Sequence, residues 1–194
     1  MEKLIGSKKI RIAVFISGTG SNLHNLIKHS KLKRSNFSVL FIFSDDKNAK
    51  GLNYAKKFKI PFKVLNFKNK TNSENQLLEY LKTKYIKIIC LAGFMKILSA
   101  KFIRKFDGKI INIHPSLLPK YKGLNTHQRV LDNFESYSGC TVHYVNAKLD
   151  AGKIILQKRV RVYKKDNAIS LAKRVLKQEH KIYPLALNKV ISNL

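Results

Sequence analysis

The chain is poor in cysteine and has no tryptophan, no Cys-x-x-Cys pair and no long hydrophobic run. Its two cysteines, Cys90 and Cys140, each lie inside an apolar segment. Isolated cysteines of this kind are typical of reduced, buried thiols. The pattern therefore argues against a small protein stabilised by disulfides and against a cysteine-rich zinc site.

Neither a membrane span nor a secretory signal is present in the pattern of hydrophobic residues. The longest apolar stretch, residues 88–95, is flanked by Lys87 and Lys96 and is far shorter than the ~20 residues that a spanning helix needs. Near the N-terminus, the apolar residues 12–16 are too few for the core of a signal sequence. We therefore expect a cytoplasmic protein that does not contact the membrane, with an N-terminal tail at residues 1–8 and a folded domain at residues 9–194.

Acidic residues are scarce: the chain has 11 of them against 39 lysines and arginines, which gives a net charge of +28. A charge of this size raises nucleic acid as a partner. However, only seven of the basic residues are arginines, the residue that nucleic-acid readers favour, and the lysines are spread along the whole chain. We interpret the charge as the result of AT-biased codons at tolerant surface positions and predict no specific nucleic-acid binding. A basic nucleic-acid-binding protein without catalysis is the non-enzymatic alternative.

Apolar strands alternate with helical segments along the first part of the chain. Strands are expected at residues 9–17, 38–44, 62–67, 86–92 and 109–114, and helices at residues 23–29, 49–59, 72–84 and 99–106. Beyond residue 137 we expect strands at residues 140–146 and 154–163 and a long closing helix at residues 169–190. Strands that are apolar throughout and separated by helices indicate a parallel sheet covered on both faces. The predicted fold class is α/β, a single domain with one mostly parallel twisted sheet and antiparallel strands toward the C-terminal part.

A glycine-rich turn, residues 17–22, follows the first expected strand. Glycine lets the backbone approach an anion closely, and the next helix presents free N–H groups and the positive end of its dipole. A dinucleotide-binding fold is the alternative, since Gly18 and Gly20 follow a strand and Asp45 ends the next one. That alternative is weak, because Leu23 stands where the motif needs its third glycine. The turn therefore predicts a phosphate site.

The segment Asn112-Ile113-His114-Pro115 carries the residues best suited to chemistry. Sites in parallel sheets lie outside the carboxyl ends of the strands, and residues 112 and 114 of a strand point to the same side. Acyl transfer to an amine needs such a pair, a donor for the developing oxyanion and an acid–base group that titrates near neutrality. Asp150 is the candidate carboxylate to orient the imidazole. A histidine that is only hydrogen-bonded at a strand end is the alternative for His114.

Two other histidines have less defined roles. His143 projects from a later strand, where lining a pocket and packing in the core fit the pattern equally well. His127 lies where a loop meets a helix, and it could cap that helix or position a substrate. A zinc site built from His114, His127 and His143 lacks a closely spaced pair of ligands. We therefore predict no metal.

Five segments carry a resemblance to a known family. They are "ISGTGSNL", "LAGFMKILS", "INIHPSLLPKYKGLNTHQ", "GCTVHYVNAKLDAGKIILQ" and "QEHKIYP", and together they span residues 16–184. In order and spacing they resemble the signature segments of the phosphoribosylglycinamide formyltransferases, a family of the folate-dependent formyltransferase superfamily. The resemblance implies a Rossmann-like formyltransferase fold with a phosphate-binding N-terminal half and a folate-binding, catalytic C-terminal half.

The same resemblance implies a reaction and a set of site residues. The formyl group of 10-formyltetrahydrofolate, a co-substrate, would move to the amine of glycinamide ribonucleotide in de novo purine biosynthesis. Asn112, His114 and Asp150 match the catalytic residues of the family. Residues that match the site for the ribonucleotide and its phosphate are Gly20, Ser21, Asn22 and Glu179. Residues that match the folate site are Met95, Lys96, Ile97, Leu98, Asn112, Asn146, Ala147, Lys148, Leu149 and Asp150.

The implied mechanism is direct transfer without a covalent enzyme intermediate. The substrate amine attacks the formyl carbon, Asn112 stabilises the oxyanion, and His114 donates a proton as the intermediate collapses. We expect Asp150 to raise the pKa of His114 through its nearby negative charge. The partners would be these small molecules, and the protein would be a monomer or a homodimer.

Some features depart from the family pattern or fit related activities. Lys96 stands where the best-known members have arginine, and Leu176 replaces a polar residue that in some relatives helps to hold the ribose. A sugar-nucleotide N-formyltransferase and a formyltetrahydrofolate hydrolase share the Asn, His and Asp and are the enzymatic alternatives. A methionyl-tRNA formyltransferase is less expected, because its additional RNA-binding domain would not fit in 194 residues.

Overall fold

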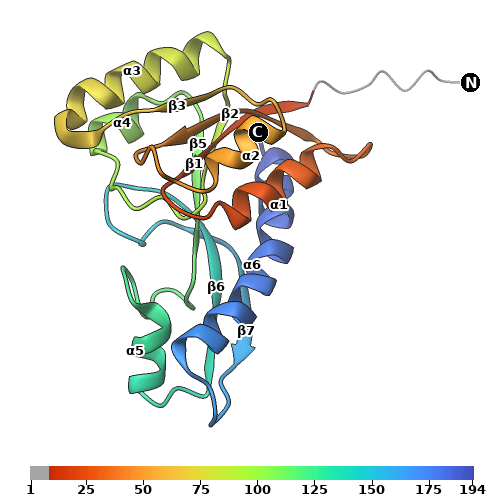
Figure 1. The fold of residues 1–194 in the computed structure, drawn as a ribbon, viewed down its shortest axis with the longest axis vertical. Helices are drawn as coiled ribbons and strands as arrows, with labels where there is room; N and C mark the ends of the chain where they lie inside the picture. Colours follow the sequence, from red (N-terminus) through yellow and green to blue (C-terminus); the bar gives the residue numbers. More distant parts are fainter. Residues whose placement is uncertain (1–8) are drawn as a thin grey trace, which may run out of the picture.

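Seven strands form one mixed sheet with the spatial order β3-β2-β1-β4-β5-β6-β7 (Figure 1). The structure, a computed structural model, describes residues 9–194, and the expected tail at residues 1–8 lies outside them. The strands are β1 (Ile10–Ile16), β2 (Phe37–Ser44), β3 (Phe62–Val64), β4 (Ile88–Leu91), β5 (Lys109–His114), β6 (Tyr137–Tyr144) and β7 (Ile154–Arg161). Strands β1 to β5 pair in parallel, whereas β6 pairs antiparallel with β5 and with β7. The predicted fold class is confirmed.

Helices cover both faces of the sheet. They are α1 (Ser21–Ser30), α2 (Leu52–Lys57), α3 (Lys70–Thr83), α4 (Ala100–Lys105), α5 (Thr126–Asp132) and α6 (Ala168–Ile191), with a short 3-10 helix η1 (Phe67–Asn69) before α3. Helices α1, α2 and α6 pack on one face, and α3 and α4 pack on the other. Helix α5 lies beside the far part of β6, away from α3 and α4 (Figure 1).

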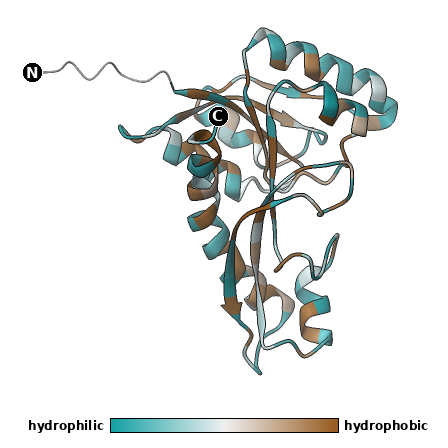
Figure 2. Ribbon diagram, turned by 180° about the vertical axis from the view of Figure 1, so that it is seen from behind, coloured by the Kyte–Doolittle hydropathy of each residue, from teal (hydrophilic) through white to brown (hydrophobic). Residues whose placement is uncertain are grey.

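The alternation of side chains along β1 divides the core into two clusters. Ile12, Val14 and Ile16 pack with the buried residues of α1, α2 and α6. Ala13 and Phe15 face the other side and pack with those of α3 and α4. Both faces of β1 are buried from Ile12 to Ile16, and this part of its sequence is apolar throughout, as a central parallel strand requires. Figure 2 shows hydrophobic residues gathered along the central strands, while α3 on the outside is largely hydrophilic.

Helix α6 ties the antiparallel part of the sheet to the parallel part. It begins at a capping box in which the side chains of Asn167 and Ser170 each accept a hydrogen bond from the backbone N–H of the other residue. Farther along, the hydroxyl group of the fully buried Tyr183 donates a hydrogen bond of 2.8 Å to the carbonyl oxygen of Leu91. The helix is therefore fixed against β4 near the edge of the sheet where the strands end.

Several boundaries differ from the sequence prediction, and three of them are instructive. Strand β3 stops at Val64 instead of residue 67, because the Asn66 side chain accepts a hydrogen bond from the Lys68 N–H and starts η1. Strand β6 begins at Tyr137 instead of residue 140, because the residues before Cys140 also pair with β7, although Gly139 has a low strand propensity. The helix expected to begin near residue 127 is α5, which starts one residue earlier.

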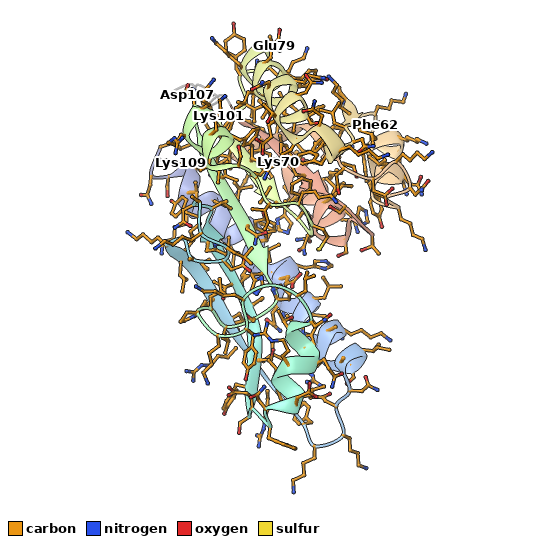
Figure 3. All side chains as sticks on the ribbon, turned by 90° about the vertical axis from the view of Figure 1, so that its left-hand side faces the viewer. Phe62, Lys70, Glu79, Lys101, Asp107 and Lys109 are labelled. Carbon is orange, nitrogen blue, oxygen red and sulfur yellow. The ribbon has the colours of Figure 1, made fainter. Side chains whose placement is uncertain are left out.

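Lysines lie on the surface of the molecule, and the cysteines lie inside it. Lysine side chains project into solvent from widely separated elements, among them Lys101 and Lys109 (Figure 3). The two cysteines are buried and free, and burial raises the pKa of the Cys140 thiol to about 12. Within residues 9–194, no helix has both the length and the hydrophobicity needed to cross a membrane.

Candidate active site

A cleft of about 840 Å³ opens where the carboxyl ends of β4 and β5 meet the start of α1 and the loop before β7. Most of the residues predicted for the site line it. They are Asn22, Met95, Lys96, Ile97, Leu98, Asn112, His114, His127, His143, Asn146, Ala147, Lys148, Leu149, Asp150 and Glu179. Gly20 and Ser21 are not among the described residues that line the cleft; they form the N-cap and the first residue of α1. The fold thus gathers segments that are far apart in the sequence.

The pairing of β5 with β6 brings an amide and an imidazole together. Asn112 lies directly opposite His143 in the antiparallel register, so their side chains share one face of the sheet. Asn112 Nδ2 lies 3.2 Å from His143 Nε2, and His143 Nδ1 lies 2.8 Å from the carbonyl oxygen of Tyr144. Because a carbonyl can only accept, we assign the ring proton to Nδ1, and Nε2 then accepts a hydrogen bond from Asn112. His143 both lines the cleft and fixes the orientation of the Asn112 amide.

His114 lies two residues after Asn112 on the same face of β5 and is held between two oxygen atoms. Its Nε2 lies 2.8 Å from the carbonyl oxygen of Tyr121, and its Nδ1 lies 3.4 Å from Asp150 Oδ2. The other carboxylate oxygen, Asp150 Oδ1, lies 3.6 Å from His143 Nε2. The structure therefore brings Asn112, His114 and Asp150 together, with His143 between the amide and the carboxylate.

Asp150 is held by the loops on either side of the cleft. Its Oδ2 accepts a hydrogen bond of 2.9 Å from the Gly123 N–H. Its backbone has a φ of 45°, in the left-handed region that few residues other than glycine adopt. Burial raises the pKa of Asp150, but the Gly123 N–H and the neighbouring His114 hold it below its usual value. Asp150 is therefore a carboxylate anion at neutral pH.

Burial also decides the pKa of His114. Desolvation lowers this pKa, while the Tyr121 carbonyl and the Asp150 carboxylate raise it, and the net pKa lies below the usual value. The sequence-based expectation that Asp150 raises the pKa of His114 is correct for the carboxylate's own effect. It is wrong for the net direction, because His114 is only 6% exposed and a buried imidazolium loses its hydration. The imidazole is therefore neutral in the free protein at about pH 7.

The start of α1 has the geometry of an anion site. Gly20 is the N-cap, and no side chain caps the helix, so its first backbone N–H groups have no side-chain acceptor. Gly20 has a φ of 72°, and a Cβ atom there would lie 2.6 Å from the Cα of Gly51. Glycine is therefore required at this turn both by its conformation and by its contact with the loop after β2. Free N–H groups and the helix dipole favour a bound phosphate at such a position.

Asn22 and Glu179 form a buried pair on the cleft wall beside this helix end. Asn22 Nδ2 donates a hydrogen bond of 2.7 Å to Glu179 Oε2, whereas Asn22 Oδ1 is buried without a partner. Burial raises the pKa of Glu179, and the hydrogen bond from Asn22 offsets this only in part. Since a buried acceptor without a donor is unfavourable, the pair is suited to hydroxyl or amine groups of a ligand.

His127 adds a second unpartnered polar atom. It lies in the first turn of α5 and lines the cleft, and its Nδ1 is buried without a hydrogen-bond partner. Burial and, to a lesser degree, His114 lower its pKa. No side chain caps α5, so of the two roles predicted for His127, facing the cleft fits the structure and capping does not.

Large apolar side chains stand exposed along the rest of the cleft. Met95, Ile97, Leu124 and Leu149 line it and are between 54% and 72% exposed. Exposed apolar side chains gathered on one concave surface are typical of a binding site for an apolar ring system. Leu98, by contrast, is 5% exposed and anchors its segment in the core.

Some cleft residues were not predicted from the sequence. Leu124 and Asn125 lie in the loop between β5 and α5, and Ala168 is the first residue of α6. A local signal existed for Asn125, whose φ of 54° asparagine tolerates better than most residues, in a loop directly after Gly123. Ala168 has no local signal, because only the packing of α6 brings it near.

No group of three or more histidine, cysteine, aspartate or glutamate side chains within residues 9–194 has the arrangement needed for a metal ion. In particular, the ring nitrogens of His143 face Asn112 and Tyr144. The zinc alternative built on His114, His127 and His143 therefore has no geometric support.

Comparison with known proteins gives a consistent result. The family model described as "Formyl transferase" matches residues 10–187. The phosphoribosylglycinamide formyltransferase of Haemophilus influenzae is 41% identical over 91% of this chain and 85% of its own length. The trifunctional purine biosynthetic protein adenosine-3 of Bos taurus is 46% identical over 95% of this chain, which spans only 19% of that longer protein.

The structural comparison agrees with the sequence comparison. The crystal structure of phosphoribosylglycinamide formyltransferase from Brucella melitensis matches with a TM-score of 0.89 and 44% identity, and covers 94% of this chain and 95% of its own. The fold is thus shared with a solved phosphoribosylglycinamide formyltransferase. The chain belongs to the formyl transferase family and, within it, to the phosphoribosylglycinamide formyltransferases.

Proposed function

We propose that this chain transfers the formyl group of 10-formyltetrahydrofolate to the amine of glycinamide ribonucleotide, a step of de novo purine biosynthesis. One observation carries the proposal. A single cleft joins an uncapped helix N-terminus to an exposed apolar wall, and Asn112, His114 and Asp150 lie between the two. Such a cleft has a place for a phosphate, a place for an apolar ring system and an acid–base group at their junction.

The acceptor would bind at the end of the cleft formed by α1. Its phosphate would accept hydrogen bonds from the first N–H groups of the helix at Gly20, Ser21 and Asn22. The buried pair of Asn22 and Glu179 would receive the ribose hydroxyl groups, which can donate to Glu179 and to the unpartnered Asn22 Oδ1. This placement directs the free amine of the substrate toward Asn112 and His114.

The folate would bind along the apolar wall. Its rings would cover the exposed side chains of Met95, Ile97 and Leu149, and the burial of these side chains would favour binding. The segment at residues 95–98 has one polar side chain, Lys96, so its backbone groups would supply most of its hydrogen bonds to the ring. Lys96, whose side chain is 49% exposed, lies at the same wall as a cation for the acidic part of the folate.

The chemistry follows from this arrangement in balanced steps. The amine nitrogen attacks the formyl carbon, a new C–N bond forms, and the carbonyl electrons move to the oxygen, where the Asn112 amide donates a hydrogen bond. The ammonium that results loses a proton to His114. The oxyanion then re-forms the carbonyl, the bond to folate N10 breaks, and N10 takes the proton from His114. No metal is needed for these steps, because Asn112 and His114 supply the donor and the proton carrier.

The low pKa of His114 suits this role. A neutral imidazole can accept the proton of the attacking amine, which an imidazolium could not do. Once protonated, the imidazolium lies 3.4 Å from the Asp150 carboxylate and donates to the Tyr121 carbonyl, so both of its N–H groups have acceptors. Asp150 would therefore stabilise the charged form only while the proton is in transit.

Two related activities are not favoured by the comparisons. A sugar-nucleotide N-formyltransferase and a formyltetrahydrofolate hydrolase would keep the same three residues, but the Haemophilus influenzae relative and the Brucella melitensis structure are both phosphoribosylglycinamide formyltransferases by name. The test is a spectrophotometric assay of folate release from 10-formyltetrahydrofolate with glycinamide ribonucleotide, with an amino-sugar nucleotide and with no acceptor. Release that requires glycinamide ribonucleotide supports the proposal. Release without an acceptor identifies a hydrolase, and release only with the amino sugar contradicts the proposed acceptor.

A further inference from the structure

Two side chains that the proposed mechanism does not use connect three loops at the edge of the sheet. Ser17 follows β1, Asp45 follows β2, and residues 93–98 follow β4. Neither Ser17 nor Asp45 is among the described residues that line the cleft. Both nevertheless contact the segment that forms its apolar wall.

The contacts form a continuous network from Asp45 through Ser17 to Met95 and Lys96, which we call the relay. Ser17 Oγ donates a hydrogen bond of 2.5 Å to Asp45 Oδ1 and accepts one of 2.8 Å from the Met95 N–H. A hydroxyl group has a single proton, so its donation to the carboxylate leaves its lone pairs free for the Met95 N–H. The other carboxylate oxygen, Asp45 Oδ2, lies 3.8 Å from Lys96 Nζ. Asp45 thus acts on both the backbone and a side chain of the same segment.

Asp45 is buried and has few alternatives to these partners. Its side chain is 7% exposed, and a buried carboxylate is stable only when it is hydrogen-bonded and paired with a cation. The strands themselves do not need the relay, because β1 is already paired with both β2 and β4 through regular ladders. The contacts therefore serve the segment after β4 more than the sheet.

The segment after β4 depends on these contacts for its position. Residues 94–99 contain no helix or strand, and Met95 and Ile97 are 61% and 62% exposed, so core packing does not hold them. At the far end, the Ser99 N–H donates a hydrogen bond of 2.7 Å to Glu74. Between these points, Phe94 and Leu98 pack against the core, and the Ser17 N–H donates a hydrogen bond to the Gly93 carbonyl. The hydrogen bond from the Met95 N–H to Ser17 Oγ holds the backbone where the exposed residues 95–97 begin.

We propose that Asp45 is a positioning residue that, through Ser17, fixes the Met95 backbone and Lys96 in the arrangement that binds the formyl folate. The inference rests on the proposed function and deepens it. Ser17 also precedes the turn at Gly18 and Gly20, whose conformation defines the start of α1. The relay therefore holds the folate wall at a fixed distance from the phosphate end of the cleft.

Steady-state kinetics of matched variants test the proposal. Ser17→Ala and Asp45→Ala should each raise the KM for the formyl folate about tenfold, because the first removes the acceptor of the Met95 N–H and the second removes the carboxylate that orients this acceptor. The kcat and the KM for glycinamide ribonucleotide should stay within about twofold. Asp45→Asn should recover most of the lost affinity, since a carboxamide oxygen can still accept from Ser17. Asp46→Ala, at the exposed neighbouring residue, is the control and should change nothing.

Two measurements that need no turnover separate this inference from the proposed function. Hydrogen exchange of the Met95 amide should become at least about tenfold faster in Ser17→Ala, while the Ser99 amide is unchanged. Calorimetric binding of a stable 10-formyl folate analogue should weaken in the same variants and recover in Asp45→Asn. If the wild-type protein bound the analogue but made no product, the proposed function would fail while these shifts would still support the relay. The positioning role of Asp45 would be overturned if the KM for the formyl folate and the exchange of the Met95 amide were both unchanged. It would also be overturned if kcat, the affinities for both substrates and the thermal stability all fell to the same degree.

Discussion

Asp166 and Asp150 are both buried carboxylates with a lowered pKa, and their surroundings differ in kind. Asp166, before α6, accepts hydrogen bonds from Arg174 (Nη1, 2.7 Å), from Ser170 Oγ (2.8 Å) and from the Tyr163 N–H (2.8 Å). The hydrogen bonds of Arg174 hold the pKa of Asp166 well below its usual range. Every partner of Asp166 is a short, well-oriented donor.

The carboxylate of Asp150 lies at longer distances from most of its partners. Its two histidine neighbours lie at 3.4 and 3.6 Å, and its one short hydrogen bond comes from the Gly123 N–H. The cleft around these partners also holds the unpartnered atoms of Asn22 and His127, among the described residues. The Asp166 cluster, in which every group has a hydrogen-bond partner, is called the saturated cluster, and it contributes stability. The Asp150 cluster is called the unsaturated cluster, because it keeps groups free to bind a ligand and to carry a proton.

The largest effect should come from the unsaturated cluster. His114→Ala or Asp150→Ala should lower kcat about 10²- to 10⁴-fold, because the proton carrier or the charge that stabilises it is lost. The unfolded fraction should not change measurably, since neither side chain is needed to hold the sheet. Turnover assays combined with thermal melting check this, with Asp107→Ala, which removes an exposed carboxylate, as the control. Unchanged turnover in either variant would remove the proposed role in proton transfer.

A smaller effect should follow from the residue that orients the amide. His143→Leu should lower kcat about tenfold, because Asn112 loses the acceptor at 3.2 Å that fixes its side chain. Affinity for the ribonucleotide, which we propose binds at α1, should be kept. Single-turnover kinetics check this, and His29→Ala at the end of α1 is a matched histidine control. A His143→Leu variant with wild-type kcat would show that His143 only packs.

The saturated cluster should behave in the opposite way. Arg174→Ala should lower the free energy of unfolding by about 1–2 kcal/mol, because Asp166 loses its cation at a partly exposed site. Turnover should be unchanged, since Arg174 is not among the described residues that line the cleft. Urea denaturation and the standard assay check both statements, with Lys173→Ala as the exposed neighbour for comparison. Loss of turnover without loss of stability would contradict the division between the two clusters.

The smallest effect concerns the titration of His114. Its imidazole should titrate below the ordinary pKa of about 6.5, and kcat/KM should rise with pH through the same midpoint. Asp150→Asn should move this midpoint to a still lower pH, because the carboxylate raises the pKa of His114. NMR titration of the ring protons measures both midpoints without turnover. A wild-type midpoint above the ordinary value would show that Asp150 outweighs burial, as the sequence alone suggested.

The titration of His114 also has a consequence for stability. The folded protein keeps His114 neutral at pH values where the unfolded chain binds a proton. Its contribution to the free energy of unfolding is therefore complete above about pH 6.5 and decreases as the pH falls toward the folded pKa. The window of this loss lies on the acidic side of the ordinary histidine pKa.

Much of the fold follows from local sequence patterns. The apolar runs at β1, β4 and β5 are buried on both faces, and this pattern is enough to predict a covered parallel sheet. The side-by-side placement of Asn112 and His114 follows from the two-residue period of a strand. These features were predictable because each depends on neighbours in the chain.

Other features depend on contacts between distant segments and could not be predicted in this way. The orientation of Asn112 by His143 depends on the register of β5 against β6, which no local pattern gives. The net pKa of His114 depends on how deeply the loops bury it, and the sequence showed only the nearby charge of Asp150. The relay from Asp45 through Ser17 to Met95 joins three strand ends, and in the sequence Asp45 was read only as the end of a strand.

Transfer of a labelled formyl group tests the central claim most directly. The protein would be given 10-formyltetrahydrofolate carrying ¹³C in its formyl group, together with glycinamide ribonucleotide, and the label would be followed by NMR. The account predicts that the label moves to the amine nitrogen of the ribonucleotide without passing through free formate, and that His114→Ala abolishes this transfer. Label released as formate, or transfer that persists in His114→Ala, would contradict the account.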